Sequence, residues 1–122
     1  MRRLARSFGY AMRGVGDFFR FQANARIHLA AAVIVTAAGF WLKIPTGKWI
    51  VLILAMGLVF MAEAMNSALE WLADAVHPHH HPLVGRAKDV AAGGVLMAAV
   101  AAAIVGVLVF WAPLLDHISH AE

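Results

Sequence analysis

The chain alternates between long apolar stretches without charge and short polar segments. Two stretches, 27–42 and 90–115, are mostly apolar and contain no Asp, Glu, Lys or Arg, and a third, 49–76, begins apolar and continues at helical period without a breaker. A hydrocarbon core about 30 Å thick needs about 20 apolar residues in a helix. Pro and Gly interrupt the chain at 43–48, and two prolines exclude a helix across 77–82. The pattern predicts three membrane-spanning helices, the second extending beyond the bilayer.

The segment 2–21 has a different pattern. Its apolar residues recur at steps of three and four, and Arg6, Arg13 and Arg20 repeat every seven residues. This arrangement is typical of an amphipathic helix that lies in the headgroup plane. Three glycines leave an irregular basic tail as the alternative. We expect an all-α fold, with a surface helix followed by three spans, in a single domain of residues 1–122.

Composition supports the bilayer as solvent and suggests an orientation. Hydrophobic residues make up 62% of the chain and charged residues 14%, against about a quarter charged in soluble domains. Six of the ten lysines and arginines precede residue 27. Anionic lipid headgroups explain this basic start better than nucleic acid. The positive-inside rule places the N-terminus and the 77–89 loop in the cytoplasm.

The chain has no Cys, which excludes thiolate and disulfide chemistry.

A polar stripe runs along the second predicted span. Glu63, Asn66, Glu70 and Asp74 follow one another at steps of three, four and four, so they share one helix face. At 1.5 Å per residue from Trp49, Glu63 lies about 21 Å into the membrane, within the inner leaflet. Ionisable residues at that depth are costly and usually functional. Glu70 lies about 10 Å farther along, near the cytoplasmic interface.

Carboxylates at these two depths suit two different tasks. A carboxylate among acyl chains can take a proton from an alcohol. An interfacial carboxylate can hold Mg²⁺, which is usually shared with substrate phosphates. Lys88 can neutralise phosphoryl charge, and Asp89 can cap the third helix or orient Lys88. The alternative is that the stripe only hydrogen-bonds neighbouring helices. That alternative explains Asn66 well and Glu63 poorly, because Gln or Ser would serve at lower cost.

The third span carries Ala98, Ala102 and Gly106 at steps of four. Small residues at this spacing let membrane helices approach closely. Three short helices can hardly enclose a polar site alone, so we expect the chain to form a homo-oligomer.

Two motifs resemble those of a known family. The run from Glu63 to Glu70 with Asp74, and the segment 85–93, closely resemble the prokaryotic diacylglycerol kinase family, which includes the undecaprenol kinases. The likeness extends from about Arg3 to Leu115. It implies a homotrimer of three-span protomers in the bacterial inner membrane, with composite active sites between neighbouring protomers on the cytoplasmic side.

The resemblance also implies roles for individual residues. Gln22 stands where the family usually has a second metal-binding Glu, and a neutral amide supplies an oxygen but no charge, so one or two metal ions remain possible. The implied roles are Glu63 as general base, Asn66 and Lys88 as groups that position and neutralise the reacting atoms, Glu70 as a ligand of Mg²⁺, and Arg6, Tyr10, His81, Lys88 and Asp89 as residues near the nucleotide.

The function predicted from these features is transfer of the γ-phosphate of MgATP to the hydroxyl of a membrane lipid alcohol. Diacylglycerol would give phosphatidic acid, and undecaprenol would give undecaprenyl phosphate. The segments 24–28 and 88–93 look more like the undecaprenol branch. Two alternatives are a small oligomeric proton or cation channel that uses Glu63 and Glu70, and a catalytically degenerate scaffold, suggested by Gln22. The histidines of 77–81 can bind Zn²⁺ or Ni²⁺ opportunistically.

Overall fold

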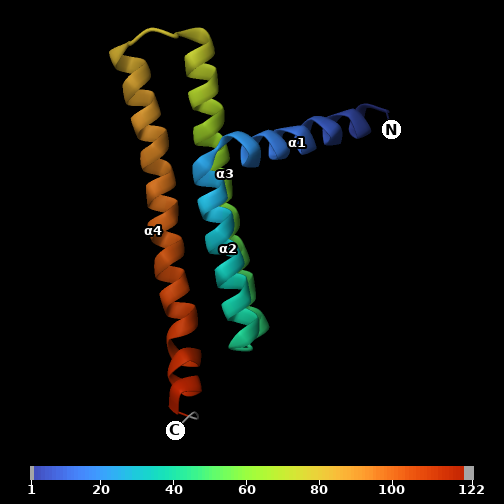
Figure 1. The fold of residues 1–122 in the computed structure, drawn as a ribbon, viewed down its shortest axis with the longest axis vertical. Helices are drawn as coiled ribbons and strands as arrows, with labels where there is room; N and C mark the ends of the chain where they lie inside the picture. The colour runs from blue at the N-terminus through green and yellow to red at the C-terminus, as the bar shows by residue number, and fades with distance from the viewer. Residues whose placement is uncertain (1, 120–122) are drawn as a thin grey trace.

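The computed structural model describes residues 2–119 as four helices joined by short connections (Figure 1). Residue 1 and residues 120–122 of the expected domain lie outside this range. Three of the helices are long and apolar enough to cross a membrane, which agrees with the prediction at the level of three candidate spans. The helices are α1 (Arg2–Phe21), α2 (Ala23–Trp41), α3 (Thr46–Val76) and α4 (Pro82–Ser119).

The helices are longer than the apolar stretches that predicted them. α2 begins at Ala23 rather than at 27, and α4 begins at Pro82 rather than at 90 and runs past 115 to Ser119. The difference arises because hydropathy marks the part of a helix inside the bilayer and not the helix itself. At 1.5 Å per residue, α3 spans about 46 Å and α4 about 57 Å, well beyond a hydrocarbon core of about 30 Å.

The start of α4 shows why a helix can begin inside a segment expected to be a loop. Proline is favoured at the first position of a helix, where its missing N–H is not needed. The preceding residue, His81, accepts a hydrogen bond at Nδ1 from the backbone N–H of Leu83, at 3.2 Å. This imidazole therefore acts as the N-cap.

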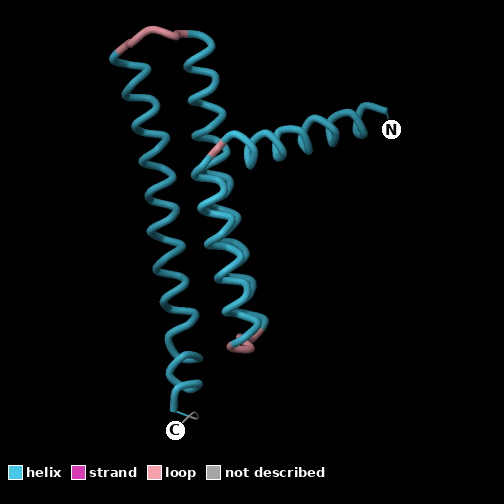
Figure 2. Tube along the Cα trace, in the orientation of Figure 1, coloured by secondary structure: helices cyan, strands magenta, loops and turns pink. Residues whose placement is uncertain are grey.

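The arrangement of the helices separates α1 from the bundle. α3 and α4 lie side by side, α2 runs beside the first part of α3, and α1 projects sideways from the start of α2 (Figures 1 and 2). The chain turns at Gln22, which has an extended backbone. Phe19 of α1 packs edge-on against Phe60 of α3, with ring centroids 5.8 Å apart, and fixes this junction to the bundle. α3 and α4 extend past the point where α1 meets the bundle, and their connection lies at that end (Figure 1).

The end of the bundle at which α2 connects to α3 holds an apolar core. Ile44, Leu52 and Val109 are buried together there. Gly39 is required here, because a Cβ at this position would lie 2.7 Å from the Trp49 ring. The absence of a side chain at Gly39 lets the last turn of α2 lie close to the Trp49 ring at the start of α3.

A lysine from α3 donates a hydrogen bond to a backbone carbonyl of α4 that has no donor within its own helix. Pro113 lies inside α4 and has no N–H for the carbonyl of Val109, four residues earlier. Lys48 Nζ donates a hydrogen bond to that carbonyl at 2.7 Å. The ammonium group thus joins the first turn of α3 to the last part of α4.

We expect Lys48→Met to destabilise the fold by about 2 kcal/mol, the usual value for a hydrogen bond to a charged group. Denaturation of the purified protein in detergent micelles measures this loss. Lys43→Met is the control, because Lys43 is exposed in the connection just before α3. Pro113→Ala restores a backbone donor for Val109 and should remove most of the effect of Lys48→Met. Equal stability of the Lys48 and Lys43 variants would contradict this interpretation.

The fold exposes much more surface than a compact protein of its size. Its accessible surface is 9186 Å², whereas a compact soluble chain of 13.1 kDa exposes about 6,400 Å². Many of the exposed side chains are large and apolar. Lipid tails or further copies of the chain are the surroundings that suit such a surface.

Candidate active site

A buried carboxylate lies at the start of the polar stripe on α3. Glu63 is 1% exposed, and Ser67, one turn later, is equally buried. The Ser67 hydroxyl donates a hydrogen bond to the backbone carbonyl of Glu63 at 2.8 Å, and not to its side chain. Within residues 2–119, Glu63 Oε2 has no hydrogen-bond partner. A buried carboxylate oxygen without a donor is unfavourable unless another molecule supplies one.

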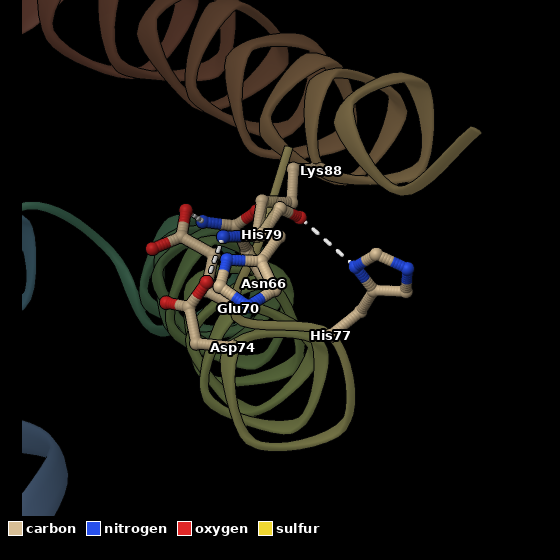
Figure 3. Close-up of polar contacts among 6 residues, drawn as sticks. All are labelled: Asn66, Glu70, Asp74, His77, His79 and Lys88. Carbon is tan, nitrogen blue, oxygen red and sulfur yellow. Dashed lines mark hydrogen bonds and ion pairs between the residues drawn. The ribbon is translucent and has the colours of Figure 1, made fainter. Parts of the chain in front are cut away.

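Asn66 and Glu70 form the second part of the site. Asn66 Nδ2 donates a hydrogen bond to Glu70 Oε1 at 3.1 Å (Figure 3). Asn66 is 6% exposed, and its Oδ1 has no partner in the part of the chain that the structure describes. Glu70 is half-buried, and this hydrogen bond uses one of its two oxygens. The amide therefore orients Glu70 and leaves carboxylate oxygen free for a hard cation.

Lys88 of α4 pairs with Asp74 of α3 and bridges the two helices close to their connection (Figure 3). Both side chains are partly exposed, and exposed ion pairs contribute little to stability. The ammonium group can therefore leave Asp74 when a more highly charged anion approaches. Asp89 is exposed and lies seven residues after the start of α4, so the prediction that it caps this helix is wrong.

The histidine run is organised by local hydrogen bonds. His77 Nδ1 lies 2.9 Å from the carbonyl of His79, and the rings of His77 and His81 lie 5.0 Å apart. Across the described residues, no set of three or more His, Cys, Asp or Glu side chains is close enough to hold a metal ion. A metal bound at Glu70 therefore needs further ligands from phosphates, water or another chain.

The residues expected near the nucleotide are not gathered within one chain. Arg6 and Tyr10 lie on exposed faces of α1, which projects away from the α3–α4 pair (Figure 1). The Arg13 guanidinium lies 5.7 Å from the centre of the Tyr10 ring. Gln22 is half-buried at the α1–α2 junction. One chain thus brings Glu63, Asn66 and Glu70 together on α3, and places Lys88 beside the same helix.

Sequence reasoning missed two contacts at this site. The Ser67 hydrogen bond was detectable in principle, because Ser lies four residues after Glu63 and can bond back to that carbonyl. The pairing of Lys88 with Asp74 depends on how two helices align across the loop between them, and no local pattern indicates that alignment.

Comparisons with known proteins give one consistent result for the sequence. The family model described as prokaryotic diacylglycerol kinase matches residues 9–110. The chain is 37% identical to the undecaprenol kinase of Bacillus subtilis over 110 residues, which cover 90% of this chain and 89% of that protein. It is 44% identical to a diacylglycerol kinase of Synechocystis over 111 residues, 90% of this chain and 63% of the longer relative. The diacylglycerol kinase of Escherichia coli K12 is 29% identical over 109 residues, 89% of each chain.

Proposed function

This chain belongs to the prokaryotic diacylglycerol kinase family of ATP-dependent lipid kinases, and we propose that it transfers the γ-phosphate of MgATP to the hydroxyl of undecaprenol or diacylglycerol. The observation that supports the site of this reaction is the buried Glu63 carboxylate with an unpartnered oxygen, on a helix apolar enough to span a membrane. Family membership indicates an enzyme rather than a channel.

In the proposed reaction, the lipid hydroxyl donates a hydrogen bond to Glu63 Oε2. As the hydroxyl oxygen attacks the γ-phosphorus, its proton passes to the Glu63 carboxylate, and the bond from the γ-phosphorus to the β–γ bridging oxygen breaks to release ADP. General-base catalysis of this kind contributes about 10²- to 10⁴-fold in rate. Lys88 moves from Asp74 to the phosphates and balances the charge that spreads over the transferred group.

We propose Glu70 as the protein ligand of Mg²⁺, held in orientation by Asn66. Bound Mg²⁺ neutralises charge on the ATP phosphates. Gln22 can offer a carbonyl oxygen to a cation but supplies no negative charge. Arg6, Tyr10, His81 and Asp89 are proposed to contact the nucleotide.

We also propose that three copies assemble into a homotrimer in the bacterial inner membrane, with the N-terminus and the active sites on the cytoplasmic side. Three findings support the assembly. The accessible surface is large, one chain holds no group of three metal-binding side chains among residues 2–119, and α1 projects away from α4, the helix that carries Lys88. A neighbouring copy can supply its α1 to the nucleotide site.

The two substrates can be separated by direct assay. Purified protein with labelled ATP is offered undecaprenol and diacylglycerol in the same micelles. We expect faster phosphorylation of undecaprenol, because segments 24–28 and 88–93 resemble the undecaprenol branch. Faster use of diacylglycerol would reverse the substrate assignment. Failure to phosphorylate either lipid would overturn the proposed function.

The metal role of Glu70 predicts a change in Mg²⁺ dependence. We expect Glu70→Gln to raise the Mg²⁺ concentration for half-maximal rate by about tenfold or more, because an ionised ligand is lost. Turnover measured against free Mg²⁺ at saturating ATP tests this. Asp74→Asn removes a carboxylate from the next turn of α3 and serves as the control. An unchanged Mg²⁺ requirement in Glu70→Gln would refute the ligand assignment.

A further inference from the structure

Two histidines in the α3–α4 connection have hydrogen-bond partners that assign them different tautomers. His77 Nδ1 lies 2.9 Å from the carbonyl oxygen of His79 (Figure 3), which can only accept, so this nitrogen carries a proton. His81 Nδ1 accepts a hydrogen bond from the backbone N–H of Leu83 at 3.2 Å, so this nitrogen is unprotonated and Nε2 carries the proton. The two neutral rings therefore differ in which nitrogen is protonated.

Because of this difference, the two rings respond differently to an added proton. The free lone pair of His77 is on Nε2, so a proton added there leaves the hydrogen bond to His79 intact. The lone pair of His81 is on Nδ1, where it accepts from Leu83. An imidazolium ring has two N–H donors and no acceptor. Of the two rings, His81 is therefore the one whose protonation must break a hydrogen bond.

The hydrogen bond that protonation would break is the cap of α4. The His81 carbonyl accepts the first backbone hydrogen bond of this helix, from the N–H of Gly85 at 3.0 Å, and the His81 ring accepts from the N–H of Leu83. The first turn of α4 contains no Asp or Glu. An imidazolium there would add positive charge to the positive end of the helix dipole. Loss of the cap and the added charge would both destabilise the first turn.

Few charged or titratable groups surround His81. The ring of His77, at the end of α3, has its centroid 5.0 Å from that of His81. These two residues are the titratable ones among those that line the apolar groove between the ends of α3 and α4. Asp74 of α3 is paired with Lys88, and within residues 2–119 no carboxylate forms an ion pair with His81. The other titratable side chains in or near the connection are exposed: His79, His80 and Arg86.

The first turn of α4 has little packing to hold it in place. Leu83 is 66% exposed, and it borders the apolar groove between the helix ends. Lys88 lies seven residues after His81, about 10 Å farther along the helix axis. Its partly exposed ion pair with Asp74 contributes little to stability. The placement of Lys88 therefore depends on a first turn that is held largely by its cap.

We propose that His81 positions Lys88 through this cap and makes the enzyme sensitive to acidification on the side of the membrane that holds the α3–α4 connection. Neutral His81 caps α4 and keeps Lys88 in place, with Nε2–H free for the nucleotide, whereas protonated His81 releases the first turn. Imidazole rings change charge between about pH 5 and 8, so the cap is complete at the upper end of this range and is lost as the pH falls. The effect on turnover rests on the proposed function, because it assumes that Lys88 acts on the phosphates; the cap does not.

NMR spectroscopy of the full-length protein in micelles tests the cap directly, without nucleotide and with EDTA to remove metal ions. At about pH 8, where imidazole is neutral, ring ¹⁵N spectra should show the proton on Nδ1 in His77 and on Nε2 in His81. Protection of the Leu83 amide proton from solvent exchange, relative to an unfolded chain, should fall about tenfold between about pH 8 and 5, the usual effect of losing one cap. The same tautomer in both rings, or constant protection of Leu83, overturns the proposal.

A second cap residue that does not titrate provides the matched comparison. Asn is among the best N-cap residues, so His81→Asn should keep the Leu83 amide protected across the whole pH range. His80→Asn is the control, because His80 lies in the same connection and neither ring hydrogen bond involves it. It should retain the pH response of the unmodified chain. A pH response that persists in His81→Asn, or that disappears in His80→Asn, contradicts the assignment.

Turnover measured at saturating ATP and lipid tests the link to Lys88. Between about pH 8 and 5, kcat of His80→Asn should fall about tenfold more than kcat of His81→Asn, because only the former can lose its cap. Titration of Glu63 affects both variants alike, and the comparison does not depend on the absolute activity of either. Equal falls in kcat would overturn the positioning of Lys88. A pH-dependent cap without lipid phosphorylation by the unmodified chain would refute the proposed function, whereas phosphorylation with a pH-independent cap would refute the role of His81.

Discussion

Replacing Glu63 with Gln is expected to abolish lipid phosphorylation while MgATP binding survives. Gln keeps the size of the side chain but cannot take the proton of the lipid hydroxyl. The expected loss is about 10²- to 10⁴-fold, the range for a general base. Because Glu63 is buried and Oε2 has no partner in the described chain, a neutral amide should not destabilise the fold through lost contacts.

The measurement is turnover of labelled ATP with lipid, beside equilibrium binding of the nucleotide to the same preparation. Ser67→Ala is a useful comparison, since Ser67 is equally buried but bonds only to the backbone carbonyl of Glu63. It should retain most of its activity. Turnover of Glu63→Gln close to that of the unmodified chain would refute the base assignment. Loss of ATP binding together with turnover would indicate damage to the fold rather than to the chemistry.

Replacing Lys88 with Met is expected to lower kcat by about 10²- to 10³-fold, the usual effect of removing one group that stabilises developing negative charge. The side chain of Met has similar length, and the partly exposed ion pair with Asp74 contributes little to folding. The thermal stability of the variant should therefore change only slightly.

Asp74→Asn separates catalysis from helix pairing. If the ion pair only joins α3 to α4, then Lys88→Met and Asp74→Asn should impair turnover equally. If Lys88 acts on the phosphates, only Lys88→Met should lower kcat strongly, because Asp74→Asn leaves the ammonium group in place. Steady-state kinetics of the two variants with saturating lipid distinguishes these results, and equal losses would contradict the proposed role.

The polar stripe on α3 shows how much of the candidate site the spacing of residues along one helix can predict. Glu63, Asn66 and Glu70 were predicted to share a face from their spacing alone, and the Asn66–Glu70 hydrogen bond spans one such step of four. The burial of Glu63 also follows from its depth in an apolar segment. These properties are local to one helix, and helix geometry converts sequence spacing directly into spatial position.

The ends of the helices were harder to predict. Hydropathy placed the third span at 90–115, whereas α4 runs from Pro82 to Ser119. A charged segment can continue a helix once it leaves the hydrocarbon, and the His81 cap then selects the first residue. Hydropathy indicates whether a residue lies in hydrocarbon or in water. It does not indicate whether the backbone at that residue is helical.

By itself, the sequence determined the class of this protein: an all-α chain with three apolar spans, a basic amphipathic start, and the paired motifs of a lipid kinase family. Only the tertiary structure decided which groups meet across helices: Lys88 with Asp74, and Lys48 with the carbonyl of Val109. The physical reason is that spacing along one helix fixes which side chains share a face, whereas contacts between helices depend on their relative shift and rotation, which packing of the whole chain sets.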